Sequence, residues 1–152
     1  MAEPSLHYRG DIIVMVAFEP DTPLVYTNFC GATGIDLTID NAIQETLVGD
    51  CQDWSLPIKT IAAYGAQTVT ATINAQLARQ NRDRLLLWAK DQMEIPVRFH
   101  FVNAEAGQTE YMDGVGMLPS LGLSGIGNDQ GSVITTTLNL RFKNGLEFTA
   151  AT

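Results

Sequence analysis

The sequence predicts a mainly β domain, an antiparallel β-sandwich or barrel with one flanking α-helix. Several segments alternate apolar and polar residues with the period of two that half-buried strands show. One other segment carries its apolar residues at helical spacing. The chain of 152 residues has the size of one domain, so we expect a single core built from residues 1–152.

Five segments carry the strand signal. Residues 11–19 form a nearly continuous apolar run. The other four place apolar side chains on one face and threonine, asparagine or charged side chains on the other; they are residues 35–39, 66–73, 95–102 and 132–142. The many threonines fit a pleated, half-exposed surface better than a helix.

A single helix is predicted over residues 74–92. Asn74 is a suitable N-cap, and Leu77, Leu85 and Trp88 lie along one stripe of the helix. An apolar stripe of this kind packs on a neighbouring layer. We therefore expect the helix to lie across a sheet with Trp88 as its structural anchor.

Glycine and proline mark the expected loops. Residues 114–131 hold six of the thirteen glycines, and 128–131 (NDQG) predict a hairpin turn leading into the last strand. Residues 20–34 and 49–60 are further irregular stretches, and the second contains Trp54, which we expect to be structural. Long ordered loops in a small β domain usually serve binding.

Both ends of the chain are expected to lie outside the sheet. Residues 1–10 predict an N-terminal arm, and residues 143–152 predict a C-terminal tail. Neither a secretion signal nor an apolar run long enough to span a membrane is present in the sequence.

The charge of the chain limits its partners. The formal net charge is -8 and only 17% of residues are charged. A protein that grips nucleic acid needs clustered lysine and arginine, so the net charge argues against that role. A surface rich in uncharged polar residues is cheaper to desolvate than a charged one, which favours burial against protein partners.

The two cysteines, Cys30 and Cys51, stand at the ends of a segment that reads as a hairpin. If this hairpin turns near Asp40 and Asn41, the two thiols lie close together. A zinc site or a redox pair needs closely spaced ligands or a CxxC motif, and the sequence has neither. We expect two apolar core residues, and a disulfide closing outside the cell remains an alternative.

No residue pattern predicts catalysis, a cofactor or a metal site. His7 falls in the N-terminal arm and His100 on the outward face of a strand, so neither has a partner base or nucleophile in the sequence. The carboxylates Asp36, Asp40 and Glu45 do not follow the calcium-loop spacing. We interpret them, together with Thr38, as a small acidic, lysine-free face of one hairpin.

The order of these features resembles the major tail tube proteins of long-tailed, siphovirus-type bacteriophages. The resemblance covers about residues 10–143 and rests on TNFCGATGIDLTID, then TLVGDCQDW, a lone helix ending in LLLWAK, the strand IPVRFHF, and EYMDGVGMLPSLGLSGIGNDQGSVITTTLNLRF. Its most specific part is the order of the Cys-Gly pair, the Leu-Thr-Ile strand and Asp-Cys-x-Asp followed by Trp54.

The resemblance implies a structural virion protein that is not an enzyme and needs no cofactor. It implies hexameric rings that stack into a hollow tube, assembled in the host cytoplasm and located in the virion tail. It also implies tail terminator, tape measure and distal tail proteins as partners, no membrane, and DNA that passes through without specific binding.

Within such a tube, the hairpin at residues 35–48 is expected to line the channel with Asp36, Thr38, Asp40 and Glu45. The loops 20–34 and 49–60 are expected to grip neighbouring subunits. Two other functions remain open: an inner-tube subunit of a contractile tail or secretion system, and a small ligand-binding β-barrel protein with a closed pocket.

Overall fold

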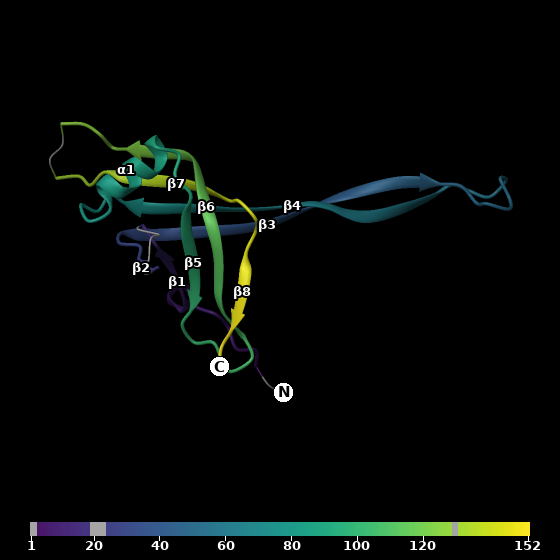
Figure 1. Cartoon of the computed structure of the whole chain (residues 1–152), viewed down its shortest axis with the longest axis horizontal. Helices are drawn as coiled ribbons and strands as arrows, with labels where there is room; N and C mark the ends of the chain where they lie inside the picture. Colours follow the sequence, from purple (N-terminus) through teal and green to yellow (C-terminus); the bar gives the residue numbers. More distant parts are fainter. Residues whose placement is uncertain (1–2, 19–23, 129–130) are drawn as a thin grey trace.

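A computed structural model describes residues 3–18, 24–128 and 131–152. Within these ranges the chain forms one antiparallel sheet of eight strands in the order β2-β1-β5-β6-β7-β4-β3, with β8 beside β6, and one α-helix (Figure 1). In chain order the elements are the 3-10 turn η1 (Arg9–Asp11), β1 (Ile12–Val16), β2 (Thr27–Asn28), β3 (Ala32–Val48), β4 (Lys59–Gln76), α1 (Arg82–Lys90), β5 (Ile95–Phe101), β6 (Thr109–Ser124), β7 (Thr135–Phe142) and β8 (Glu147–Ala150). The expected fold class is confirmed.

The long strand β6 joins two parts of the sheet. Its first part pairs with β5 on one edge and β8 on the other, whereas its second part, Gly116–Ser124, pairs with β7. In Figure 1, β5, the first part of β6 and β8 run across the direction of β7, β4 and β3. The sheet therefore folds over itself, and one core fills the space inside the fold.

This core takes one face from each of several strands. In β7, buried and exposed residues alternate along the whole strand, as the period of two requires. The fully buried side chains are Val16, Ile73, Leu85, Trp88, Ile95, Val97, Phe99, Leu138 and Leu140, which come from β1, β4, α1, β5 and β7.

Two strands lie where the sequence predicted loops or a tail. Residues 109–124 form β6, so the glycines at 114–122 belong to a strand. A methyl group on Gly114 would lie 2.7 Å from Phe142 and 2.9 Å from Leu146, and one on Gly116 would lie 3.2 Å from Val97. These glycines allow close packing rather than a turn. The turn predicted at 128–131 falls partly outside the described residues.

The helix is shorter than predicted because its first residues belong to a strand. Asn74 pairs with Gly34 and Thr137 inside the sheet, so the predicted N-cap is wrong. Asn81 precedes the helix, and its side-chain amide donates to the Cys30 carbonyl oxygen at 3.0 Å. The anchor role of Trp88 is supported by complete burial and by an edge contact with Phe18, with the ring centroids 6.4 Å apart.

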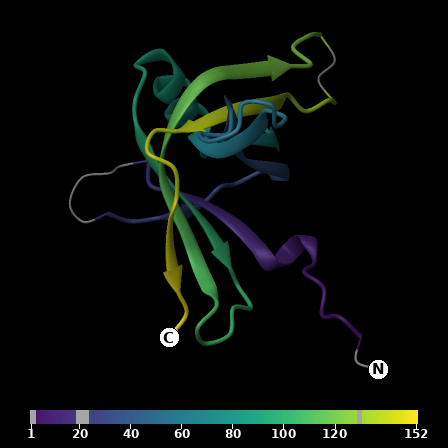
Figure 2. The ribbon, with the colours of Figure 1, turned by 90° about the vertical axis from the view of Figure 1, so that its right-hand side faces the viewer.

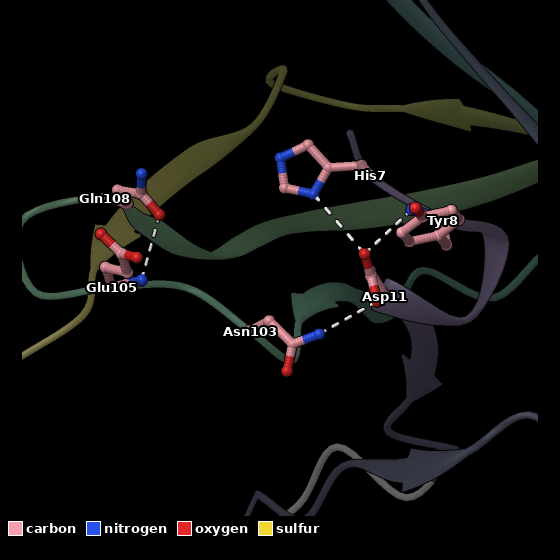
Figure 3. A network of polar contacts seen from close by, with 6 residues as sticks. All are labelled: His7, Tyr8, Asp11, Asn103, Glu105 and Gln108. Carbon is pink, nitrogen blue, oxygen red and sulfur yellow. Dashed lines mark hydrogen bonds and ion pairs between the residues drawn. The ribbon is translucent and has the colours of Figure 1, made fainter. Parts of the chain in front are cut away.

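The two ends of the chain are tied to the loop between β5 and β6. At the C-terminal end, the Ala151 carbonyl accepts from the Gly107 N–H at 3.1 Å and the Ala151 N–H donates to the Gln108 carbonyl at 2.7 Å. The contacts of the N-terminal end are drawn in Figure 3. The Asp11 carboxylate accepts hydrogen bonds from the Tyr8 backbone N–H at 2.9 Å and from the Asn103 side chain at 3.0 Å. The C-terminal tail predicted over 143–152 is wrong in part, because Glu147–Ala150 form β8 beside β6. The ends therefore close the lower part of the sheet.

Candidate assembly surfaces

The hairpin formed by β3 and β4 is longer than the sequence predicts. Its strands have 17 and 18 residues, and the turn lies at residues 49–58 rather than near Asp40 and Asn41. Asp40 pairs with Thr68 in the middle of the ladder. Neither strand contains a tight-turn dipeptide there, so pairing continues to Val48 opposite Lys59.

The prediction that Cys30 and Cys51 lie close together is therefore wrong. Cys30 precedes β3 and Cys51 follows it, so 17 residues of extended strand, about 3.3 Å each, separate them. A disulfide needs Cα atoms within about 7 Å. Both thiols are free and exposed rather than part of the core. Cys51 lies at the tip of the hairpin, outside the packed region, whereas Cys30 is exposed beside the buried Phe29.

Pairing along the hairpin divides the predicted acidic residues between two faces. Asp36, Thr38 and Asp40 oppose threonines of β4 on the outward face. Glu45 lies an odd number of residues after Asp40, and β3 has no bulged residue between them. Because side chains alternate along a strand, Glu45 lies on the opposite face. The register shift near residue 42 is taken up by β4, where Gly65 stands against Ala42 and Gln44.

The outward face of the hairpin continues across β7 and the second part of β6. Thr72 Oγ1 lies 3.3 Å from Asn139 Oδ1, so both side chains lie on this face. We call it the polar sheet face. Its members on four adjacent strands are Asp36, Thr38, Asp40, Thr68, Thr70, Thr72, Asn74, Gln76, Thr135, Thr137, Asn139, Arg141, Met117, Ser120 and Ser124.

The sequence indicates that single strands expose polar residues, but it does not indicate that these strands form one surface. The alternation in 132–142 exposes threonines and Arg141, as the alternation in 35–39 exposes Asp36 and Thr38. Nothing local in the sequence indicates that the two strands share one surface, because β4 stands between them. Only the pairing of β4 with both β3 and β7 brings them onto one face.

Beyond the packed body, the hairpin projects as an arm. β7 covers β4 only along Thr70–Gln76, and the rest of the hairpin extends away from the body (Figure 1); it is seen end-on in Figure 2. We call residues 42–66 the hairpin arm. Its exposed large apolar side chains are Ile43, Leu47, Val48, Trp54, Leu56, Ile58, Ile61 and Tyr64.

The apolar face of the hairpin continues beyond the core along the arm, where it is exposed to solvent. Ile35 and Leu37 pack on the core, and by strand alternation Ile43 and Leu47 lie on the same face. Leu47 is 71% exposed, and Tyr64, which pairs with Ile43 across the arm, is 80% exposed. Contiguous exposed apolar side chains on a protein of this size mark an interaction surface.

The tip of the arm is an ordered loop. Asp50 accepts hydrogen bonds from the backbone N–H groups of Gln52 and Asp53, at 2.7 and 2.8 Å, and Asp53 accepts from the hydroxyl and N–H of Ser55. Hydrogen bonds to the ionised form lower the pKa of both carboxyls. Trp54, expected to be structural, is 91% exposed between them.

A groove opens on the body between the N-terminal segment and β3. Its volume is about 820 Å³. Its wall combines apolar side chains, among them Ile13, Phe29, Ile35, Leu37, Phe99 and Met112, with the polar residues Arg9, Thr33, Asp36 and Asn74. The groove lies where the sheet fails to close, because β1 and β3 approach one another without pairing.

The segment before β2 is held on the sheet by a stacked arginine. The Arg98 guanidinium lies 4.1 Å from the Tyr26 ring and 4.3 Å from the Tyr111 ring, and its Nε donates to Asp113 at 2.6 Å. The hydrogen bond to Asp113 raises the pKa of Arg98, and burial raises the pKa of Tyr26.

The loop predicted over residues 20–34 is wrong in part, because some of these residues belong to β2 and β3. Residues 20–23 lie outside the described residues.

The histidines have structural surroundings. His100 Nε2 lies 3.4 Å from Glu110, and its ring stacks near Tyr111. His7 Nδ1 lies 3.9 Å from Asp11. In the described ranges, no three histidine, cysteine or acidic side chains are placed to hold a metal ion, and none of the helices there has the length and apolarity to cross a membrane.

Comparisons by sequence find no matching family model and no matching curated protein. Comparison of the fold does find relatives. The tail of an empty gene transfer agent particle, refined with helical C6 symmetry, is similar with a TM-score of 0.70 at 10% identity, covering 95% of this chain and 100% of that chain. The SPP1 tail tube is similar with a TM-score of 0.69 at 9% identity, covering 95% and 79%.

A third relative comes from a contractile system. The sheath/tube terminator of an extracellular contractile injection system has a TM-score of 0.60 at 13% identity and covers 98% of this chain and 100% of that chain. The chain thus has the fold of tail tube proteins. The likeness to phage tail tubes is confirmed at the level of the fold, and these relatives are structural components rather than enzymes.

Proposed function

We propose that this chain is a structural virion protein that polymerises as stacked rings into a phage tail tube. The observation that carries the proposal is the hairpin arm, whose apolar face has no cover within the described chain. An arm of this size must be buried in the functional state, since an exposed apolar strand pair invites uncontrolled association.

The hairpin arm and the groove are different surfaces, so an arm that docks in the groove of another copy makes a head-to-tail contact. A head-to-tail contact between unlike surfaces generates rings or helical filaments, whereas a self-complementary surface stops at a dimer. The tip side chains Trp54, Leu56 and Ile58 are apolar, and so are many of the side chains in the groove wall. We infer that the arm of one copy docks in the groove of a copy in the neighbouring ring.

Lateral contacts within a ring use the two free edges of the polar sheet. Among the described residues, β3 and the second part of β6 pair on one side only. The order β6-β7-β4-β3 alternates strand direction, so β3 runs opposite to β6. Rotation about a ring axis therefore sets the β3 of one copy antiparallel to the β6 of the next, which allows regular pairing. The C6 symmetry of the gene transfer agent tail supports six copies.

In this arrangement the polar sheet face lines the channel. Asp36, Thr38 and Asp40 lie on it, while Glu45 lies on the arm's other face and leaves the proposed lining. Carboxylates near the lumen repel phosphates over about one Debye length, roughly 8 Å at physiological salt. DNA therefore passes without binding during ejection. The tail terminator, tape measure and distal tail proteins are proposed partners, with assembly in the host cytoplasm.

A contractile inner tube is the second candidate, because the injection-system terminator shares the fold. The two functions differ in the outer surface, since a contractile tube must bind a sheath. The ligand-binding alternative has less support, because the groove is open rather than a closed pocket.

Negative-stain microscopy of the purified protein tests the proposal. We expect hollow tubes of uniform diameter that build up above a critical concentration. A folded monomer that stays monodisperse at high concentration contradicts polymerisation. Tubes that recruit a purified sheath protein along their length favour the contractile function, and tubes that do not favour the non-contractile one.

A further inference from the structure

The polar sheet face does not by itself fix how two copies align. Along the β6 edge, where copies are proposed to join, it presents Ser120, Gly122 and Ser124. A slip of two residues along such an edge replaces one small residue by another and keeps the same faces. Register is weakly specified in such strands, so a tube of constant diameter needs a further determinant.

Charge is scarce on this face and placed near its two edges. Among the members of the polar sheet face named above, the charged side chains are Asp36, Asp40 and Arg141. The two carboxylates lie on β3, which is one free edge. Arg141 lies on β7 and pairs with Met117 of β6, so a single strand separates it from the other free edge.

The three side chains have no ion-pair partner in the described part of their own chain. All three are exposed, and the salt bridges of the described residues involve other groups. Arg141 pairs in register with Thr70 and Thr38, whereas the carboxylates lie in the rows on either side. The arginine is therefore free to meet a carboxylate on a second copy.

We propose that Arg141 forms an ion pair across the β6 edge with Asp36 or Asp40 of the next copy and thereby sets the register at which copies join. This inference rests on the proposed function. When β3 of the next copy pairs with β6, two strand spacings, about 10 Å, separate its backbone from that of Arg141. An extended arginine side chain directed along the row spans most of that distance. Charge pairs of this kind contribute specificity and alignment more than affinity.

Charge reversal measures the effect. Arg141→Glu is expected to raise the critical concentration for polymerisation about fivefold at low salt, the upper range for one exposed pair. Adding Asp36→Lys or Asp40→Lys in the same chain restores it, and the variant that restores it identifies the partner carboxylate. The difference shrinks near 1 M salt, where the Debye length is about 3 Å. A purely structural role of Arg141 predicts no such salt dependence.

Lys90→Glu is the matched control, because it makes the same change of net charge on α1, whose Leu85 and Trp88 pack in the core rather than on the polar sheet face. Circular dichroism melting of the dilute monomers checks that each variant folds. Wild-type-like tubes from Arg141→Glu, or no restoration by either aspartate reversal, overturn the ion pair while leaving the proposed tube intact. Absence of tubes from the wild-type protein overturns the proposed function and this inference with it.

Discussion

Both halves of the β3–β4 hairpin carry apolar side chains on one face, but these side chains lie in opposite environments. Near the body, Ile73 is 1% exposed in the core, whereas Ile43 on the arm is 54% exposed. Both lie on the same face of the ladder. The apolar side chains of this face therefore serve two cores, one within the chain and one proposed to form between copies.

Removing the arm is expected to have the largest effect. Replacing residues 43–64 by a two-residue Asn-Gly turn shortens the hairpin to the part that contacts the body. We expect a folded monomer that forms no tubes at any accessible concentration, as measured by sedimentation and microscopy. Normal tubes from this variant would show that the arm does not join copies.

The two tryptophans should separate folding from assembly. Trp88→Ala is expected to lower the free energy of unfolding by about 3–5 kcal/mol, since Trp88 is fully buried. Trp54→Ala should change monomer stability by less than about 0.5 kcal/mol. It should weaken assembly by about 2 kcal/mol if Trp54 is an interface anchor. Denaturant unfolding of monomers and the critical concentration measure the two quantities, and equal effects on both would contradict the separation.

Reversing the lining charge is expected to have a smaller effect, on DNA passage. Particles carrying Asp36→Lys and Asp40→Lys should still form tubes at higher protein concentration, and their DNA ejection should slow several-fold at low salt because lysines bind phosphate. Glu105→Lys combined with Glu147→Lys is the control with the same change of net charge, since these exposed carboxylates lie on the β5–β6 loop and on β8, off the polar sheet face. Unchanged ejection by the double variant would remove the polar sheet face from the lumen.

The tip loop should show the smallest effect, as a dependence on pH. The pKa values of Asp50 and Asp53 are lowered in the folded state, so their contribution to loop order is complete above the ordinary value of 3.8. It is lost as pH falls through the lower folded values. The protection factors of the Gln52 and Ser55 amides, which correct for the intrinsic pH dependence of exchange, should fall only at the acidic end, and Asp50→Asn should lower the protection of Gln52 already at neutral pH. Protection factors that stay the same at all pH values in both proteins would contradict this account.

The fold class, the acidic net charge and the buried anchor residue of the helix can all be predicted from the sequence alone. These properties are local: alternation reports which side of a strand is buried, and a large aromatic residue on an apolar stripe reports where a helix packs. The cysteines show where local reading stops. The predicted proximity of the two thiols depended on a turn near Asp40. Alternating apolar and polar residues are equally compatible with a turn there and with a strand that continues past Asp40.

Three features became known only from the tertiary structure. They are the length of the hairpin, the strand formed by residues 109–124, and the polar face that four strands share. Each depends on contacts between residues far apart in the chain. Gly114 reads as a loop residue until Phe142 and Leu146 are seen to occupy the space that a side chain would need. Strand partners are selected by packing across the whole sheet, and a single strand's sequence carries no record of its neighbour.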